Sequence, residues 1–162
     1  MLSKSKEKQQ KVMGKILVVD DEANARQTLA MLLEESGFEV RAASDGIKAL
    51  GILKSEWTPD IVLTDLRMPL MDGFELIRKI KESNTMEQPA IVVMTAFASV
   101  ESAVEVMKQG ADDYLTKPLN FDAVEMTLTR VMERVHMKRE LEELRQTIHQ
   151  NKAERRRMIG SS

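Results

Sequence analysis

Apolar residues recur along this chain in short runs that are separated by longer segments with helical spacing. Consecutive apolar or β-branched residues fill 16–19, 61–64 and 90–94, and each run has the length of a strand that is covered on both faces. Weaker strands are expected at 38–42, where apolar and polar residues alternate, and at 113–116. Strands of the first kind are typical of parallel sheets that carry helices on each side.

Each expected strand is followed by a segment whose apolar residues recur every three or four positions, which predicts a helix. These apolar positions are Ala25, Leu29, Leu32 and Leu33, then Ala49, Leu50 and Leu53, then Leu76, Ile77 and Ile80, and finally Val100, Ala103, Val104 and Met107. Ser44 or Asp45, Asp72 and Ser99 are expected to cap three of these helices, and Gly37 to end the first. Five strand–helix repeats predict an α/β fold with a doubly wound parallel sheet, so the carboxyl ends of all strands meet at one edge.

The last predicted helix begins near Asn120 and meets no Gly or Pro before Gly160, which makes it much longer than a helix that only covers a sheet. Its first apolar stripe steps by four, three and four residues and is expected to dock on the sheet: Val124, Leu128, Val131 and Val135. After a slip in register the same spacing resumes among charged residues, as in a short coiled-coil seam: Met137, Leu141, Leu144 and Ile148. We expect a homodimer through this helix. The alternative is a solvated single helix, since the seam is short.

The composition restricts the function classes. The 162 residues carry a net charge of -2, so a broad nucleic-acid-binding surface is not expected. The chain has no cysteine, which excludes disulfides, thiol chemistry and cysteine-ligated metals and fits a cytoplasmic protein. No apolar run approaches the roughly 20 residues that span a bilayer. The Lys/Gln-rich residues 1–14 are expected to form a flexible leader.

Four of the expected strands end in residues that can bind a metal or a phosphate. Asp20 and Asp21 follow the first strand, Asp65 follows the third, Thr95 ends the fourth and Lys117 follows the fifth. In parallel α/β sheets, ligands bind in the crevice beyond the carboxyl ends of the strands. Three carboxylates this close would repel one another, and a divalent cation with oxygen ligands, best Mg²⁺, would relieve that repulsion.

A bound cation would make a phosphoryl group a natural further ligand. Lys117 can neutralise phosphoryl oxygens, Thr95 can donate a hydrogen bond, and Asp65 can attack phosphorus in line. The product of that attack is an aspartyl phosphate. Taken singly, the same residues are more typical of helix caps, strand ends and a solvated lysine.

The chain from Lys15 to about Arg134 resembles the receiver domain of bacterial two-component response regulators. Four motifs carry the resemblance, and they occur in order: VVDDE at 18–22, DLRMPLMDG at 65–73, MTA at 94–96 and GADDYLTKP at 110–118. The resemblance implies a flavodoxin-like (βα)5 fold with strand order 2-1-3-4-5 and a cis peptide bond before Pro118. It also implies a sensor histidine kinase as the partner that donates the phosphoryl group.

By the same resemblance, Asp65 is the phosphoacceptor, and Asp20, Asp21, Asp65 and the backbone carbonyl of Arg67 hold Mg²⁺. The implied activity is self-catalysed phosphoryl transfer to Asp65 and its autodephosphorylation, so the chain is a signalling module and not an enzyme with a separate substrate.

The resemblance further implies a switch. Thr95 and Lys117 bind the phosphoryl group, and Thr95 moves towards it. Tyr114 then turns into the space left behind, which the small side chain of Ala96 permits.

The long last helix and the stretch 94–104 resemble the nitrogen-regulation, NtrC-like class of sigma-54-dependent activators. Residues 158–162 resemble the opening of the AAA+ ATPase domain of that class. We therefore expect a receiver at 15–134, a helical linker at 135–157 and a truncated output domain from 158. No G-x-x-x-x-G-K-[ST] motif occurs, so ATP hydrolysis by this chain is not expected. Sigma-54 RNA polymerase and DNA would be reached only through output domains beyond these residues.

Other functions remain open at this point. A haloacid-dehalogenase-like phosphatase would use a D-x-D motif after its first strand, whereas the nucleophile here follows the third strand and reads Asp65-Leu66-Arg67. A stand-alone receiver or a dimerising scaffold without an output domain would keep the same fold. Whether phosphorylation forms or breaks the dimer is also open.

Overall fold

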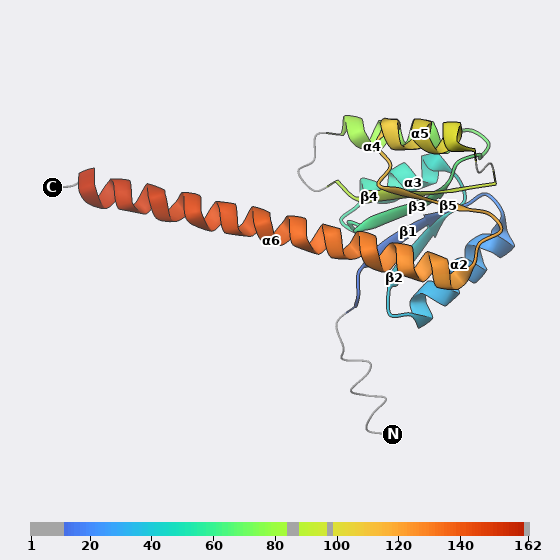
Figure 1. Cartoon of the computed structure of the whole chain (residues 1–162), viewed down its shortest axis with the longest axis horizontal. Coiled ribbons are helices and arrows are strands. Elements are labelled where there is room, and N and C mark those ends of the chain that lie inside the picture. The colour runs from blue at the N-terminus through green and yellow to red at the C-terminus, as the bar shows by residue number, and fades with distance from the viewer. Residues whose placement is uncertain (1–11, 84–87, 97–98, 161–162) are drawn as a thin grey trace, which may run out of the picture.

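In the computed structural model, which describes residues 12–83, 88–96 and 99–160, five parallel strands form one sheet. Their order is β2-β1-β3-β4-β5, as the resemblance implied (Figure 1). The strands are β1 (Lys15–Val19), β2 (Glu39–Ala43), β3 (Ile61–Asp65), β4 (Ala90–Thr95) and β5 (Asp113–Thr116). The three inner strands β1, β3 and β4 are almost entirely buried, because helices cover both faces of the sheet.

Two helical layers enclose the sheet (Figure 1). Apolar residues of α3 (Gly46–Leu53), α4 (Gly73–Glu82) and α5 (Val100–Gln109) pack on one face in a first core. α2 (Ala23–Glu35) and the start of α6 (Phe121–Gly160) pack on the other face in a second core. Leu76, Ile77 and Ile80 are buried against the sheet, as their spacing predicted. The doubly wound α/β architecture is thereby confirmed.

The predicted caps of α3, α4 and α5 are confirmed. Asp45, Asp72 and Ser99 each accept a hydrogen bond from the backbone N–H three residues later. α2 differs, because its N-cap residue Glu22 makes no side-chain capping bond. The Glu22 N–H instead donates a hydrogen bond to Asp20 Oδ1 at 3.0 Å, and this bond holds the Asp20 carboxylate at the end of β1. The cis peptide bond before Pro118 is also present.

The apolar face of α5 is turned to solvent, unlike that of α4. Val100, Val104 and Met107 share one face, as expected, but all three are exposed, and Val106 is the buried residue of this helix. The exposed face and Tyr114 of β5 line an open groove of about 570 Å³. The spacing of apolar residues identifies a common face of a helix, but it does not say which neighbour that face meets.

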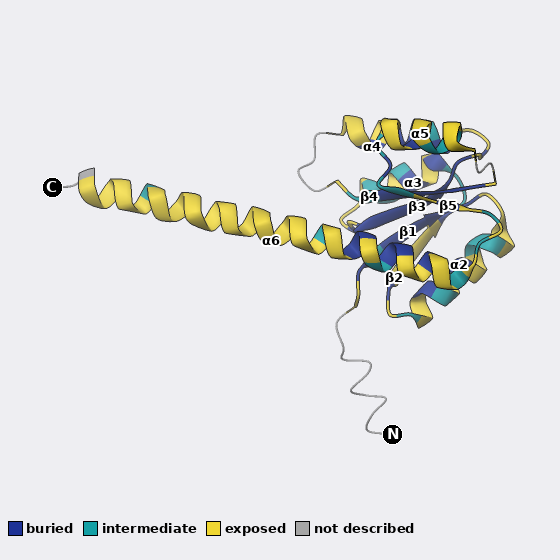
Figure 2. Cartoon of the chain, viewed as in Figure 1, coloured by how far each residue is buried: buried dark blue, intermediate teal, exposed yellow. Residues whose placement is uncertain are grey.

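α6 is one helix of 40 residues, and only its first part lies on the sheet (Figures 1 and 2). Val124, Leu128 and Val131 are buried and Val135 is half-buried in the second core, as predicted. Beyond that part the helix projects away from the sheet, and its side chains are almost all exposed (Figure 2). The helix is continuous through the predicted boundaries at 135 and 158.

An ion pair ties α6 to the sheet beyond its last apolar contact. Arg139 pairs with Asp60, which precedes β3 at the edge opposite the strand carboxyl ends. Asp60 is buried and also accepts a hydrogen bond from the Lys15 N–H at 2.7 Å. The contact between α6 and the domain therefore extends past residue 134.

Some predictions fall partly outside the described residues: 1–11 of the expected leader, Phe97 and Ala98 after the fourth strand, and 161–162 of the expected output domain. Within the ranges that the structure does describe, no helix is both long enough and apolar enough to cross a lipid bilayer.

Candidate functional site

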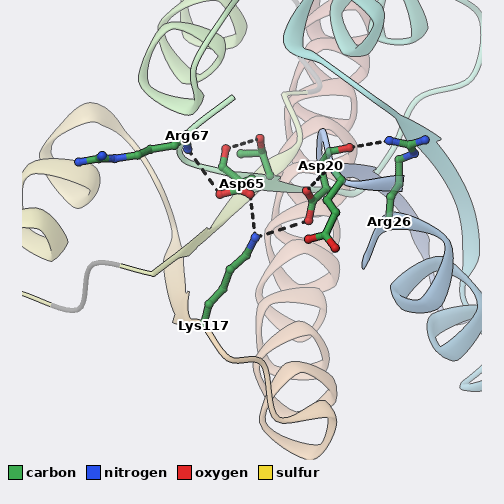
Figure 3. Close-up of polar contacts among 7 residues, drawn as sticks. Asp20, Arg26, Asp65, Arg67 and Lys117 are labelled. Carbon is green, nitrogen blue, oxygen red and sulfur yellow. Dashed lines mark hydrogen bonds and ion pairs between the residues drawn. The ribbon is translucent and has the colours of Figure 1, made fainter. Parts of the chain in front are cut away.

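The register of the sheet brings the predicted site residues together at one edge (Figure 3). β1 pairs with β3 so that Asp20 and Asp65, at the ends of these strands, lie side by side, and Asp21 follows Asp20. β4 pairs with β5, and the Lys117 N–H donates to the Thr95 carbonyl at 2.8 Å. Residues that are far apart in the sequence thus meet at the crevice, where parallel sheets bind ligands.

Lys117 is the cation of this acidic site. Its Nζ lies 2.7 Å from Asp65 Oδ2 and 3.6 Å from Asp20 Oδ2 (Figure 3). Asp20 and Asp65 are only 2% and 9% exposed, so water screens their charges poorly. Burial by itself lowers the pKa of Lys117, but the hydrogen bond and charge of Asp65, together with Asp20, outweigh it and raise the pKa above its ordinary value. Lys117 is therefore protonated throughout the neutral pH range.

The carboxylates of the site fit a divalent cation. Asp20, Asp21 and Asp65 each offer one oxygen, and these oxygens lie within 4.8 Å of one another. Mg²⁺ prefers a few carboxylate oxygens and keeps several water molecules. Asp21 is exposed, so water reaches the outer side of the group, while the other two acids are buried. The donor set agrees with the Mg²⁺ site that the sequence predicted.

A glycine allows the loop after Asp65 to return close to the strand. A Cβ on Gly73 would lie 2.8 Å from the Asp65 carbonyl oxygen and 2.9 Å from Leu66 Cα, which real Cβ atoms do not approach. The Gly73 N–H donates to the Leu66 carbonyl at 2.7 Å and so closes the loop where α4 begins. The sequence indicated a turn at Gly73, but the close backbone approach that demands glycine is a tertiary feature.

The other predicted residues surround this centre at different depths. Arg67 is exposed, and its N–H lies 3.4 Å from Asp65 Oδ1. Thr95 is buried at the end of β4, and Ala96 follows it at the surface. Tyr114 is 38% exposed and lines the open groove beside α5, so its side chain has an outward position.

Arg26 is a neighbour of the site that sequence reasoning missed. Its guanidinium donates to the Asp20 carbonyl at 2.8 Å and holds the start of α2 against the end of β1 (Figure 3). An arginine six residues after a strand-end acid is a weak signal, because many arginines on exposed helices have the same spacing. Only the angle between strand and helix brings the two groups together.

Comparison with known proteins identifies the family. Residues 16–129, most of the chain, match the response regulator receiver domain family. The chain belongs to this family, as the four sequence motifs indicated.

Its relatives include larger regulators of transcription. The chain is 37% identical over 135 residues to the regulatory protein AtoC and 44% identical over 123 residues to the transcriptional regulatory protein ZraR, both of Escherichia coli K12. These alignments cover 83% and 75% of this chain, but only 29% and 27% of the relatives. The DNA-binding transcriptional regulator NtrC of the same strain is 38% identical over 109 residues, with 67% of this chain and 23% of NtrC covered. The resemblance to the NtrC-like class is thereby confirmed.

Two solved structures of response regulators also resemble this chain. NtrX from Brucella abortus, solved in complex with ATP, matches 82% of this chain and 30% of its own, with a TM-score of 0.74 and 30% identity. The chemotaxis response regulator CheY4 of Vibrio cholerae matches 74% of this chain and 98% of its own, with a TM-score of 0.69 and 34% identity. The chain therefore spans less than a third of AtoC, ZraR and NtrX, whereas it covers almost all of CheY4.

Proposed function

We propose that this chain is the phosphoacceptor receiver of a two-component response regulator and that a sensor histidine kinase phosphorylates it on Asp65 with Mg²⁺. One observation carries the proposal. The Asp65 carboxylate stands at the end of β3, 2.7 Å from Lys117, and its oxygen lies within 4.8 Å of oxygens of Asp20 and Asp21. Membership of the receiver family supports the same reading.

Phosphoryl transfer to Asp65 requires an oxygen nucleophile and compensation of the phosphoryl charge. A carboxylate oxygen of Asp65 forms the new O–P bond while the N–P bond of the donor phosphohistidine breaks, and the histidine nitrogen keeps the electron pair. Lys117, already at hydrogen-bond distance from Asp65, neutralises the phosphoryl oxygens, and Thr95 donates a hydrogen bond to them. Water later attacks phosphorus, releases inorganic phosphate and restores the carboxylate.

The proposed Mg²⁺ ligands are Asp20, Asp21, Asp65 and the backbone carbonyl of Arg67. A bound divalent cation supplies charge compensation for the carboxylates and for the phosphoryl oxygens. Asp20 is held in place by the Glu22 N–H, which donates to its carboxylate, and by its burial. We expect a chelator to abolish phosphorylation, because the acids would then repel the incoming phosphoryl group.

The proposed switch connects the site to the open groove beside α5. Thr95 moves towards the phosphoryl oxygens, and Tyr114 turns inward into the space that it leaves, which the small side chain of Ala96 permits. The outward position of Tyr114 supports the assignment of this arrangement to the resting state. Phosphorylation would then shift the balance between two arrangements of α5, β5 and the start of α6.

In the full proposal, the switch controls dimerisation and a sigma-54-dependent output domain that activates transcription. The similarity to ZraR and NtrC supports an output of this kind, because both relatives are named as transcriptional regulators. Sigma-54 RNA polymerase and DNA are partners of such output domains and not of the receiver, and the cytoplasm is the proposed location. A stand-alone receiver or a dimerising scaffold is the alternative, and the presence of the complete acid–lysine site speaks against a scaffold alone.

Incubation with Mg²⁺ and acetyl phosphate tests the assignment of Asp65. The wild-type chain should gain one phosphoryl group by mass, and hydroxylamine should remove it, because an acyl phosphate is open to nucleophilic attack. Asp65→Asn should gain none, whereas Asp122→Asn, at an exposed carboxylate in the first turn of α6, should be labelled like the wild type. Equal labelling of Asp65→Asn and the wild type would eliminate Asp65 as the acceptor.

A further inference from the structure

A pocket at the carboxyl end of the edge strand β2 lies apart from the acid–lysine site. It has a volume of about 520 Å³ and reaches from α2 over the end of β2 to α3. Cavities of about 300–1,000 Å³ are typical of small-molecule sites. Arg26 lines the pocket, and Figure 3 shows this arginine on the side of Asp20 away from Lys117. Neither the three acids of the site nor Lys117 belongs to the described residues that line the pocket.

The pocket is lined by cations from three different elements. They are Arg26 of α2, Arg41 of β2 and Lys48 of α3, and no acid is among the described lining residues. Within the described part of the chain, none of the three forms an ion pair with a carboxylate. Asp45, the acid nearest to Lys48 in the sequence, accepts a hydrogen bond from the Lys48 backbone N–H as the cap of α3. The positive charges of the pocket are therefore available to a ligand.

A buried aromatic ring orients the Arg41 guanidinium. Its central carbon lies 4.8 Å from the centroid of the Trp57 ring. Trp57 is itself held, because it is buried and its indole N–H donates to a Glu39 carboxylate oxygen at 2.7 Å. A guanidinium that stacks on a ring keeps the N–H donors at its edge, and their fork matches phosphate oxygens. Arg41 is thus oriented before a ligand arrives, which lowers the entropy that binding costs.

Hydrogen bonds hold the other two cations and leave further donors in the pocket. The Arg26 guanidinium, which has five N–H groups, donates one of them to the Asp20 carbonyl. Lys48 Nζ donates to Ser44 Oγ at 3.0 Å. Because the Ser44 hydroxyl accepts that bond, its own O–H remains able to donate. Positive charge and several N–H and O–H donors together are the chemistry that binds phosphate oxygens.

A glycine in the middle of α3 keeps the pocket open. Gly51 lines the pocket, and a Cβ at this position would meet no atom within 4 Å. Glycine is less favourable than alanine in the interior of a helix, because it has more conformational freedom to lose. Contact with a neighbouring element does not require glycine here, whereas a ligand that enters the pocket would use the space.

We propose that this pocket binds the diphosphate group of a small molecule, either pyrophosphate or a nucleoside diphosphate. A single phosphate ester carries about 1.5 to 2 negative charges at pH 7, and a diphosphate carries more, which matches three cations better than one carboxylate does. The proposal goes beyond the phosphoacceptor function and does not depend on it, because Asp65 is not part of the pocket.

Isothermal titration calorimetry of the full chain tests the proposal at neutral pH in EDTA, so that no cation recruits phosphate to the acids. Pyrophosphate should bind with a Kd of about 1 mM or lower. Citrate, of similar charge, should bind at least about threefold more weakly, because its carboxylates are spread over a flexible skeleton. A lower Kd for ADP than for pyrophosphate would assign the ligand to the nucleotides, and an equal or higher one to free diphosphate. If neither binds, or if citrate binds as well as pyrophosphate, the proposal is wrong.

Two substitutions on α3 test the position of the ligand. Lys48→Glu should raise the Kd for pyrophosphate at least about tenfold, because a charged hydrogen-bond donor becomes a repelling acid. Lys79→Glu makes the same change in net charge on the exposed surface of α4 and should alter Kd less than about twofold. Gly51→Phe should abolish binding by filling the pocket, whereas Gly51→Ala should stay within about threefold of the wild type. Lys48→Glu changes only an exposed side chain, so it decides the test even if Gly51→Phe does not fold.

The single tryptophan gives a separate readout of where pyrophosphate binds. Its indole N–H resonance should shift on titration of the wild type, because the ligand contacts Arg41 on the Trp57 ring, and should stay unchanged in Gly51→Phe. Asp65→Asn should bind pyrophosphate like the wild type. Binding that Asp65→Asn alters and Lys48→Glu does not would place the anion in the acid–lysine site and overturn the proposal.

Discussion

The two halves of α6 carry apolar residues at the same spacing, but they meet different surroundings. Leu128 in the first half is fully buried in the second core, whereas Leu144 in the second half is 58% exposed. The sheet explains the difference, because it lies under the first half and ends before the second (Figures 1 and 2). An apolar stripe therefore identifies the face of a helix that can pack against something. The surrounding fold decides whether the rest of the same chain covers that face.

The largest effect is expected from truncating matched leucines in the two halves. Leu128→Ala should lower the free energy of unfolding by about 2–5 kcal/mol, because it leaves a cavity in a packed core. Leu144→Ala should change it by less than about 0.5 kcal/mol in a dilute, monomeric sample, because water already surrounds that side chain. Urea denaturation followed through the fluorescence of the single Trp57, which is buried, measures both values. Similar losses for the two variants would contradict the division of α6 into a docked and a projecting half.

A smaller effect is expected at the point where α6 leaves the domain. Arg139→Ala should lower the free energy of unfolding by about 1 kcal/mol, because buried Asp60 loses its cation. The loss should be no larger, because Asp60 keeps the hydrogen bond from the Lys15 N–H and the Arg139 side chain is half exposed. Amide hydrogen exchange in residues 136–142 should also become faster, since the helix would then be anchored only as far as Val135. Arg145→Ala, on the projecting half, is the matched control and should change neither property in the monomer. If the two arginine variants behave alike, the ion pair does not anchor the helix.

The smallest effect is expected from an exposed ion pair on the docked half. Arg130 of α6 lies 2.7 Å from Asp113 of β5, and its side chain is 53% exposed. Arg130→Ala should lower the free energy of unfolding by less than about 1 kcal/mol, and the loss should shrink further in high salt, which screens exposed charges. Urea denaturation at low and high ionic strength distinguishes this result from a packing effect. A loss that does not respond to salt would mean that the aliphatic part of Arg130, and not its charge, stabilises the contact.

Much of the candidate site was predictable, because it depends on strand ends. A short apolar run that stops at an acid predicts both the strand and the place of the acid, and parallel strands bring all such ends to one edge. Asp20, Asp65 and Lys117 could therefore be assigned to one site before any distance between them was known. The distances from Lys117 Nζ to Asp65 Oδ2, 2.7 Å, and to Asp20 Oδ2, 3.6 Å, could not be predicted, because they depend on the register of the sheet.

Contacts between side chains of different elements were not predictable in the same way. Arg26 reaches the Asp20 carbonyl, and Arg139 reaches Asp60, through the angle at which a helix crosses the sheet. That angle does not produce a periodic pattern of residues in the sequence. The need for glycine at position 73 was also not predictable, because it arises from the close approach of two backbone segments.

Local periodicity and turn chemistry were enough to determine the strands, the helices and the continuity of α6, because each depends on residues close together in the chain. The edge at which the acids gather followed from the parallel topology that these repeats predict. Tertiary structure alone decided which of the apolar faces the rest of the chain covers. It turned Val104 of α5 to solvent, left Tyr114 outward and left Leu144 of α6 exposed. The physical reason is that burial depends on neighbours distant in sequence, whereas periodicity reports only that a set of side chains shares one side.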